Sequence, residues 1–228
     1  MNKHAVVTGA SKGIGKAVAK YLATQGYELT LIARNSDALN QVRTEIHSVF
    51  PSLSVDVHSI DLSDDKNAYE KLVTIAQTLN RIDIVFNNAG VFTLGTLDID
   101  VDDFSNMIDI NVKGLFIVAK AFCNEMKRQK HGYIFNLGSI AGKQTFATGG
   151  GYCASKYAVL GFNGSLHQEL KPYNIKVTAL CPGVVDTDMT KAFDTPKEQK
   201  MGTDEITKAI DYLLSCGPNT HVETLDLT

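Results

Sequence analysis

Residues 4–15 of this 228-residue chain read HAVVTGASKGIG, and this stretch decides the fold. An apolar segment, His4–Thr8, is followed by a glycine-rich turn and then by Ile14–Gln25, which has helical periodicity. The glycines permit a tight turn and a close approach to a pyrophosphate, and the N-terminus of the helix offers free N–H groups to the anion. The spacing GxxxGxG is related to the GxGxxG dinucleotide-binding motif. The predicted phosphate loop consists of Gly9, Ser11, Lys12, Gly13, Ile14 and Gly15.

Short apolar runs alternate with longer helical segments along the rest of the chain. Further strands are predicted at Glu28–Ala33, Leu53–His58, Ile82–Phe86, Tyr133–Gly138, Ile175–Leu180 and, more weakly, His221–Leu227. Further helices are predicted at Ser36–Phe50, Asp64–Asn80, Val101–Gln129, Tyr152–Leu170 and Thr203–Ser215. Strands rich in Val and Ile without polar alternation are typical of sheets buried on both faces. The sequence therefore predicts an α/β fold in which residues 1–228 form one domain. We expect a doubly wound, Rossmann-type parallel sheet of about seven strands, with a mobile flap at Thr187–Gly202.

The composition excludes several classes of function. The chain is 44% hydrophobic and 21% charged, and its net charge of −3 gives no bulk attraction to nucleic acid or to an anionic membrane. No apolar stretch approaches the ~18 residues of a membrane span. The four cysteines form no CxxC pair and have no neighbouring His, so neither a metal site nor a disulfide framework is predicted. We expect a cytoplasmic protein that binds no metal, nucleic acid or membrane.

The end of the second predicted strand indicates which dinucleotide would bind. An acidic residue there would bind the adenosine ribose and favour NAD, but the strand is followed by Arg34, and the first carboxylate is Asp37. A guanidinium matches the geometry of a 2′-phosphate, and Lys12 adds a second positive charge. One or two such contacts, at about 1.5–3 kcal/mol each, favour NADPH by roughly ten- to a thousandfold. The alternative is that both are exposed surface cations.

Tyr152 and Lys156 lie four residues apart in a predicted helix, one above the other on the same face. A tyrosine acting as acid/base near neutral pH needs its pKa of ~10 lowered by about 3 units, and a nearby ammonium acts in that direction. Ser139 ends a predicted strand, where ligands bind in open α/β sheets, and its hydroxyl can hold a substrate oxygen against Tyr152. Taken alone, the pair suits a surface helix and Ser139 suits a turn. Gly149–Gly151 predicts a flexible loop or a cleft wall without bulk.

Together these motifs resemble the short-chain dehydrogenase/reductase family across nearly the whole chain. Each motif is moderately specific, and their order and spacing make the resemblance specific. The matching residues are, in order, Thr8–Gly15, Asp61, Asn87–Gly90, Asn111, Ser139, Tyr152, Lys156 and Pro182–Thr187.

The resemblance implies roles for the residues that chemistry alone does not assign. Asn111 would hold a water that links Lys156 to solvent, which gives the catalytic set Asn111, Ser139, Tyr152 and Lys156. Asp61 would contact the adenine. Asn88 would support the sheet and the cofactor site, with Asn87, Ala89 and Gly90 beside the ribose. The implied cofactor-binding residues beyond the phosphate loop are Arg34, Asp61, Leu62, Asn88, Ala89, Gly90, Tyr152, Lys156, Pro182, Gly183, Val185 and Thr187.

The resemblance implies an NADP-dependent oxidoreductase that moves a hydride between NADP(H) and a carbonyl or secondary alcohol. It is closest to beta-ketoacyl-carrier-protein reductases at Pro182–Thr190, which makes an acyl carrier a candidate partner. Lys127, Arg128 and Lys130 would suit an acidic carrier, although a solvated helix end is favoured for them. Broad carbonyl, sugar, steroid and pteridine reductases stay open.

The assembly and two rival functions complete the prediction. A homodimer or homotetramer is expected to form through the helix pair Val101–Gln129 and Tyr152–Leu170. Interfaces that use the family's Asp-Gly-Gly-like tail are not expected, because this chain ends in His221–Thr228. The alternatives to an enzyme are an NADP-binding regulatory protein on the same fold and a structural module without a cofactor.

Overall fold

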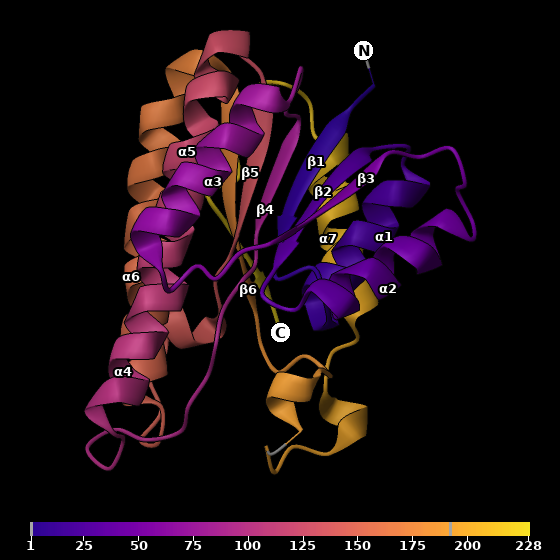
Figure 1. The fold of residues 1–228 in the computed structure, drawn as a ribbon. Helices are drawn as coiled ribbons and strands as arrows, with labels where there is room; N and C mark the ends of the chain where they lie inside the picture. Colours follow the sequence, from indigo (N-terminus) through magenta and orange to yellow (C-terminus); the bar gives the residue numbers. More distant parts are fainter. Residues whose placement is uncertain (1, 192) are drawn as a thin grey trace.

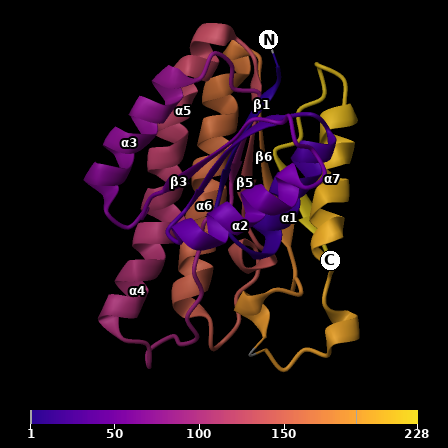
Figure 2. The same ribbon diagram turned by 45° about the vertical axis from the view of Figure 1, so that its right-hand side comes forward.

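The computed structural model describes residues 2–191 and 193–228 and contains one seven-stranded parallel sheet between two layers of helices (Figures 1 and 2). The strands are β1 His4–Thr8, β2 Glu28–Ala33, β3 Val55–Ser59, β4 Ile84–Asn87, β5 Gly132–Leu137, β6 Ile175–Pro182 and β7 Thr224–Leu227. The helices are α1 Gly13–Thr24, α2 Ser36–His47, α3 Asp65–Thr78, α4 Val101–Ile108, α5 Leu115–Gln129, α6 Gly150–Leu170 and α7 Thr203–Ser215.

The strand order is β3-β2-β1-β4-β5-β6-β7, and every neighbouring pair is parallel. The order reverses direction between β1 and β4, because the chain returns to the centre of the sheet after β3. In open α/β sheets, ligands bind at the carboxyl ends of the strands beside such a switch point. The predicted doubly wound Rossmann-type fold is therefore confirmed.

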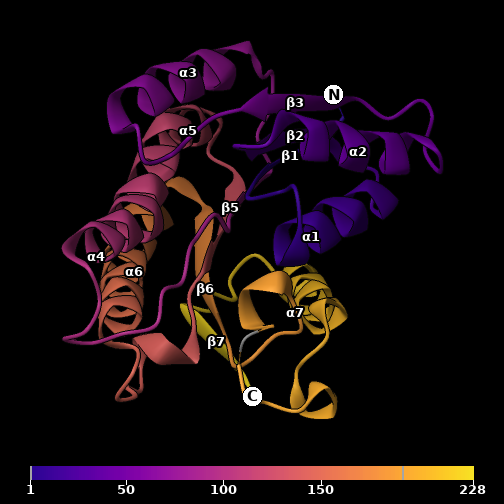
Figure 3. The ribbon, with the colours of Figure 1, turned by 60° about the horizontal axis from the view of Figure 1, so that its bottom comes forward.

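Each face of the sheet has its own apolar core. One core joins α1, α2 and α7 to the sheet through residues such as Leu22, Leu39 and Ile210. The other joins α3, α5 and α6 through residues such as Leu72, Phe122 and Leu166. Figure 3 shows these two groups of helices on opposite sides of the sheet. Both faces are covered, which explains why the central strands carry apolar residues without alternation.

The predicted helix Val101–Gln129 differs from the structure in one respect. Its middle, Asp109–Gly114, is a π-helical segment between α4 and α5. Such segments are rare and occur often at functional sites, because they change the direction of the side chains that follow. The sequence places Asn111 in this helix, but its periodicity does not reveal the extra residue in the turn.

The predicted flap, Thr187–Gly202, has two short 3₁₀ turns, Asp188–Thr190 and Lys197–Gln199. It follows β6 and lies beyond the carboxyl ends of the strands, at the bottom of Figure 1. A parallel bridge between Val185 and Met201 joins the two ends of this segment.

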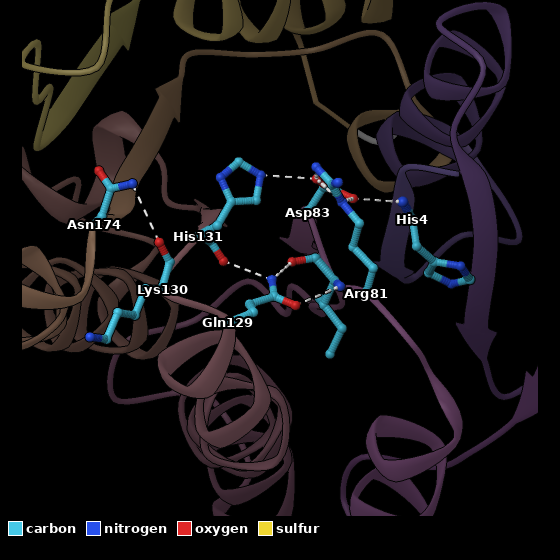
Figure 4. A network of polar contacts seen from close by, with 8 residues as sticks. His4, Arg81, Asp83, Gln129, Lys130, His131 and Asn174 are labelled. Carbon is cyan, nitrogen blue, oxygen red and sulfur yellow. Dashed lines mark hydrogen bonds and ion pairs between the residues drawn. The ribbon is translucent and has the colours of Figure 1, made fainter. Parts of the chain in front are cut away.

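A polar network ties together the opposite, amino-terminal edge of the sheet (Figure 4). The carboxylate of Asp83, which is 5% exposed, accepts hydrogen bonds from His4 N at 2.9 Å and from Arg81 Nε at 2.8 Å. His131 Nε2 lies 2.9 Å from the same carboxylate. Burial alone would raise the pKa of Asp83, but these donors outweigh it and hold the pKa well below its usual range. The network joins the first residue of β1 to the residues that immediately precede β4 and β5.

We expect Asp83→Asn to lower the free energy of unfolding by about 2–3 kcal/mol. The substitution removes the negatively charged carboxylate that both Arg81 and His131 contact. The folded-state pKa of Asp83 is depressed, so its contribution is complete above the ordinary carboxyl pKa of about 4. That contribution is lost as the pH falls through the lower folded pKa. Urea unfolding at pH 7 and pH 3 measures both effects. Asp56→Asn, at an exposed position of β3, is the matched control, and equal losses in the two variants would contradict the prediction.

Candidate active site

A cavity of about 400 Å³ opens at the carboxyl edge of the sheet, where the strand order reverses. Twelve of the predicted cofactor residues line it, and they come from the ends of β1, β2, β3, β4 and β6. These twelve are Gly9, Ser11, Lys12, Gly13, Ile14, Arg34, Asp61, Leu62, Asn88, Ala89, Gly90 and Thr187. Motif reasoning missed ten further lining residues, all close in sequence to predicted ones. These ten are Ile32, Ala33, Asn35, Ala38, Ile60, Val91, Ile110, Leu137, Asp188 and Met189.

The glycine turn is closed around the side chain of Asn88. Asn88 Nδ2 donates to the carbonyls of Thr8 at 2.9 Å and Gly9 at 3.3 Å, which ties the end of β1 to the end of β4. A Cβ on Gly9 would lie 2.5 Å from this amide nitrogen, and one on Gly15 would lie 2.6 Å from it. Gly9 also has φ +63°, in the left-handed region that favours glycine. Gly15 thus leaves room for the side chain of Asn88 under the turn, and it does not line the cavity.

Arg34 lies exposed at the rim of the cavity, immediately after β2. Within residues 2–191 and 193–228, no carboxylate lies within 4 Å of its guanidinium. Asp61 lies across the same rim. Burial would raise the pKa of Asp61, but hydrogen bonds from Ser63 and the charge of Arg34 lower it overall. Arg34 and Lys12 are therefore free to meet an anionic group of a ligand. The cradle of glycines and these two cations suit a phosphorylated dinucleotide.

Tyr152 and Lys156 lie on the first two turns of α6, and Ser139 lies just after β5. The Lys156 ammonium, which is 5% exposed, lies 5.6 Å from the centre of the Tyr152 ring and donates to the carbonyl oxygen of Leu137 at 2.8 Å. Ser139 Oγ accepts from Ala141 N at 3.1 Å and donates to Pro182 O at 3.4 Å. The segment after β5 and the start of α6 thus bring these side chains together beside the cavity, since Leu137 also lines it.

Burial has the largest effect on the protonation of this pair. Burial raises the pKa of Tyr152 to about 12, and the Ser139 hydroxyl beside it acts in the opposite direction. Burial also lowers the pKa of Lys156 to about 8. The predicted lowering of the phenol pKa depends on the ammonium together with the positive nicotinamide of a bound oxidised cofactor, whereas in the chain alone desolvation is the largest effect and raises this pKa. At neutral pH Tyr152 is therefore a phenol and Lys156 is mainly an ammonium.

Asn111 lies in the π-helical segment, and its side chain is fully engaged. Its Oδ1 accepts from Val91 N at 2.8 Å, and its Nδ2 donates to Val91 O and to Ser155 Oγ, both at 3.0 Å. The amide therefore joins three elements, namely the loop after β4, the α4–α5 helix and α6. These contacts fix the position of Asn111 between the three elements, and its predicted role in holding a water stays a prediction.

The residues after β6 form the remaining wall. Gly183 N donates to Leu227 O at 2.8 Å, and Val185 is buried at the bridge to Met201. Thr187 packs against the glycine turn, because a Cβ on Gly13 would lie 3.4 Å from its methyl group. Of the predicted residues in this segment, Thr187 lines the cavity, whereas Pro182, Gly183 and Val185 lie beside it.

Two residues of the basic cluster that would suit an acidic carrier, Lys127 and Arg128, form ion pairs with other residues of the chain. Lys127 pairs with Glu169 at 2.6 Å, and Arg128 pairs with Glu125 at 2.6 Å. Both lie in the last turn of α5, before β5, and so at the edge of the sheet opposite the cavity. This placement favours the helix-end interpretation.

Comparison with known proteins gives the family. A family model described as short chain dehydrogenase matches residues 3–198. An uncharacterized oxidoreductase of Staphylococcus epidermidis is 35% identical over 227 residues, which is 99% of this chain and 96% of the relative. The chain belongs to the short-chain dehydrogenase/reductase family. It is accordingly an oxidoreductase, as the sequence resemblance predicted.

Solved structures of this family are similar over their whole length. A betaketoacyl-[ACP] reductase from Bacteroides thetaiotaomicron is 36% identical with a TM-score of 0.86, and the alignment covers 100% of this chain and 96% of that one. An alcohol dehydrogenase from the archaeon Thermococcus sibiricus, complexed with 5-hydroxy-NADP, is 31% identical with a TM-score of 0.88, covering 99% and 95%. Members of this short-chain dehydrogenase/reductase family thus share the fold and differ in substrate.

Two features are absent from the described part of the chain. None of its helices combines the length and apolar character that crossing a bilayer demands. No group of three or more His, Cys, Asp or Glu side chains in residues 2–191 and 193–228 is arranged to hold a metal ion.

Proposed function

We propose that the protein is an NADP-dependent reductase that acts on the carbonyl of a small molecule, or on the corresponding secondary alcohol in reverse. The observation that carries this proposal is the convergence of Ser139, Tyr152 and Lys156 beside a cavity lined by a glycine turn. NADP-bound members of the family among the similar structures support the choice of cofactor.

In the proposed reaction, the cofactor and the residues of the chain would have separate roles. When bound, NADPH supplies the hydride, and the protein supplies position and protons. Tyr152 holds a proton at Oη, since burial keeps its pKa near 12, and gives it to the carbonyl oxygen. Ser139 holds that oxygen, and Lys156 returns the proton to Tyr152. Asn111 fixes the loop after β4 against α6, so that these groups stay aligned.

The glycine turn, Arg34 and Lys12 would hold the dinucleotide. The turn lets backbone come close to a pyrophosphate, and the N-terminus of α1 faces it. Arg34 and Lys12 would contact a 2′-phosphate, because neither is committed to an ion pair within the described residues. Asp61 would lie on the adenine side of the same pocket.

Turnover of a panel of ketones, aldehydes and acyl thioesters, followed by NADPH absorbance, tests the proposal. We expect oxidation of NADPH with at least one class of carbonyl. Tight binding of NADPH with no turnover of any compound would favour the alternative, a regulatory protein. The absence of dinucleotide binding would overturn the proposal altogether.

We expect Arg34→Asp to raise the KM for NADPH by roughly ten- to a hundredfold and to leave the KM for NADH unchanged or lower. The reason is that the variant removes a guanidinium facing the 2′-phosphate and adds a carboxylate that can bind ribose hydroxyls. Arg43→Asp, on α2 and outside the cavity lining, is the matched control. Equal use of NADPH and NADH by the unmodified protein would contradict this role.

The proposal includes assembly with a second copy. Phe104, Phe116 and Tyr157 lie on α4, α5 and α6 and are 39%, 44% and 45% exposed. Exposed large apolar side chains on these helices favour a homodimer or homotetramer that forms through them.

A further inference from the structure

Three aromatic rings from three separate segments pack together, and one of them is the ring of Tyr152. The Phe92 ring lies edge-on to the Tyr152 ring, with centroids 4.9 Å apart and planes at 79°. The Phe193 ring, on the segment after β6, lies 4.9 Å from Phe92 at 60°. Both phenylalanines are partly exposed. Phe92 therefore contacts both Tyr152 and Phe193.

The backbone next to Phe92 is fixed by hydrogen bonds. The preceding residue, Val91, lines the cavity and makes two hydrogen bonds with the side chain of Asn111. Asn111 is itself bonded to Ser155 on α6, one turn away from Tyr152. The Phe92 ring and the phenol that it touches are thus fixed to the same framework.

Phe193 is attached more loosely. Its segment is joined at its base by the Val185–Met201 bridge, and Thr190 Oγ1 donates to Val185 O at 2.6 Å. Beyond that base, Phe193 N donates to Thr190 O at 3.2 Å, and its ring packs on Phe92. Phe193 can therefore leave Phe92 without breaking the sheet.

We propose that Phe92 and Phe193 form an aromatic clamp for an apolar group attached to the reacting carbonyl. The substrate class is then a ketone or aldehyde with an aryl or extended alkyl group, not a polyol. This inference rests on the proposed function. Phe92 forms the fixed wall beside Tyr152, and Phe193 covers the outer side of the group. The two walls offer no hydrogen bonds to replace those that sugar hydroxyls would lose on leaving water.

The first test compares the turnover of two substrates. One is an aryl methyl ketone, and the other is hydroxyacetone, a methyl ketone with a polar group. We expect the unmodified protein to prefer the aryl ketone in kcat/KM. Phe193→Ala should raise the KM for the aryl ketone about tenfold and change the KM for hydroxyacetone much less, so that the preference for the aryl ketone falls. Phe92→Leu should have a smaller effect in the same direction, and Tyr212→Ala, at an exposed site on α7, should have none. Preference for hydroxyacetone, or equal loss with both ketones in Phe193→Ala, would overturn the clamp.

The second test does not depend on turnover. The chain contains no Trp, so Phe193→Trp places a single indole reporter at the clamp. We expect its emission to be quenched saturably by the aryl ketone and not by hydroxyacetone, whereas Tyr212→Trp should show no saturable change. A Phe193→Trp protein that does not respond to the aryl ketone would overturn the clamp. Failure of the proposed function would instead appear as clamp binding without NADPH oxidation.

Discussion

Replacing Tyr152 with Phe is expected to remove at least about 99% of turnover while the KM for NADPH and the melting temperature stay close to those of the unmodified protein. The variant loses only the phenolic oxygen. Its ring keeps the edge-on contact with Phe92, and Lys156 keeps its hydrogen bond to Leu137 O. A positioned general acid contributes about 10²–10⁴ in rate, which sets the size of the loss.

Steady-state kinetics with the best carbonyl of the panel, with NADPH binding measured by fluorescence, separates the two parts of this prediction. Tyr157→Phe is the matched control, because that phenol bonds Lys143 O at 2.7 Å on the exposed side of α6. Residual activity of Tyr152→Phe above a tenth of the unmodified rate would remove Tyr152 from the role of proton donor. Loss of NADPH binding would show that the hydroxyl serves the cofactor.

The sequence predicted the architecture because the determinants of this fold are local. The glycine turn after a short strand and the alternation of apolar runs with helical segments reflect backbone and burial requirements. Nearly every residue of β1, β2 and β6 is buried. The order of the strands then follows from right-handed crossovers. The boundaries were less accurate, and α2 ends at His47 instead of Phe50.

The features that the sequence did not predict depend on contacts between distant segments. Gly150 and Gly151 begin α6 instead of forming a loop, and a Cβ on Gly151 would lie 2.6 Å from Met107 on α4. These glycines therefore permit close helix packing. The contact of Phe92 with Phe193 joins residues about a hundred positions apart, and no motif marks either of them. The π-helical turn at Asn111 is set by its bonds to Val91 and Ser155.

The raised pKa of Tyr152 has the same origin. Motif spacing places an ammonium one helical turn from the phenol, but it does not report how deeply both groups are buried. In the structure, burial acts on the two groups in opposite senses, raising the pKa of the phenol and lowering that of Lys156. The chain alone therefore keeps Tyr152 protonated at neutral pH.

Lys156→Met is expected to abolish measurable turnover and also to stabilise the protein in the absence of cofactor. The folded-state pKa of Lys156 is lowered from 10.5 to about 8, so at pH 7 the fold carries a buried ammonium at a cost of at most about 3 kcal/mol. Methionine has a similar shape and no charge. It loses the hydrogen bond to Leu137 O, worth about 1 kcal/mol, which leaves a net gain of about 1–2 kcal/mol.

The pH dependence distinguishes this explanation from a general packing effect. Because the folded state releases the Lys156 proton at lower pH than the unfolded chain does, the unmodified protein gains stability relative to the variant as the pH rises above about 8. Urea unfolding of both proteins between pH 7 and 9.5, below the range in which tyrosines titrate, should show the gap in unfolding free energy closing. Two results would contradict this explanation: a variant that is less stable than the unmodified protein at pH 7, and a gap that does not change with pH. Either result would mean that the contacts of the ammonium with Leu137 O and the Tyr152 ring outweigh its desolvation. The proposed site would then be a stabilising feature of the fold, whereas our explanation requires that the protein holds this charge at the expense of stability because the reaction needs it.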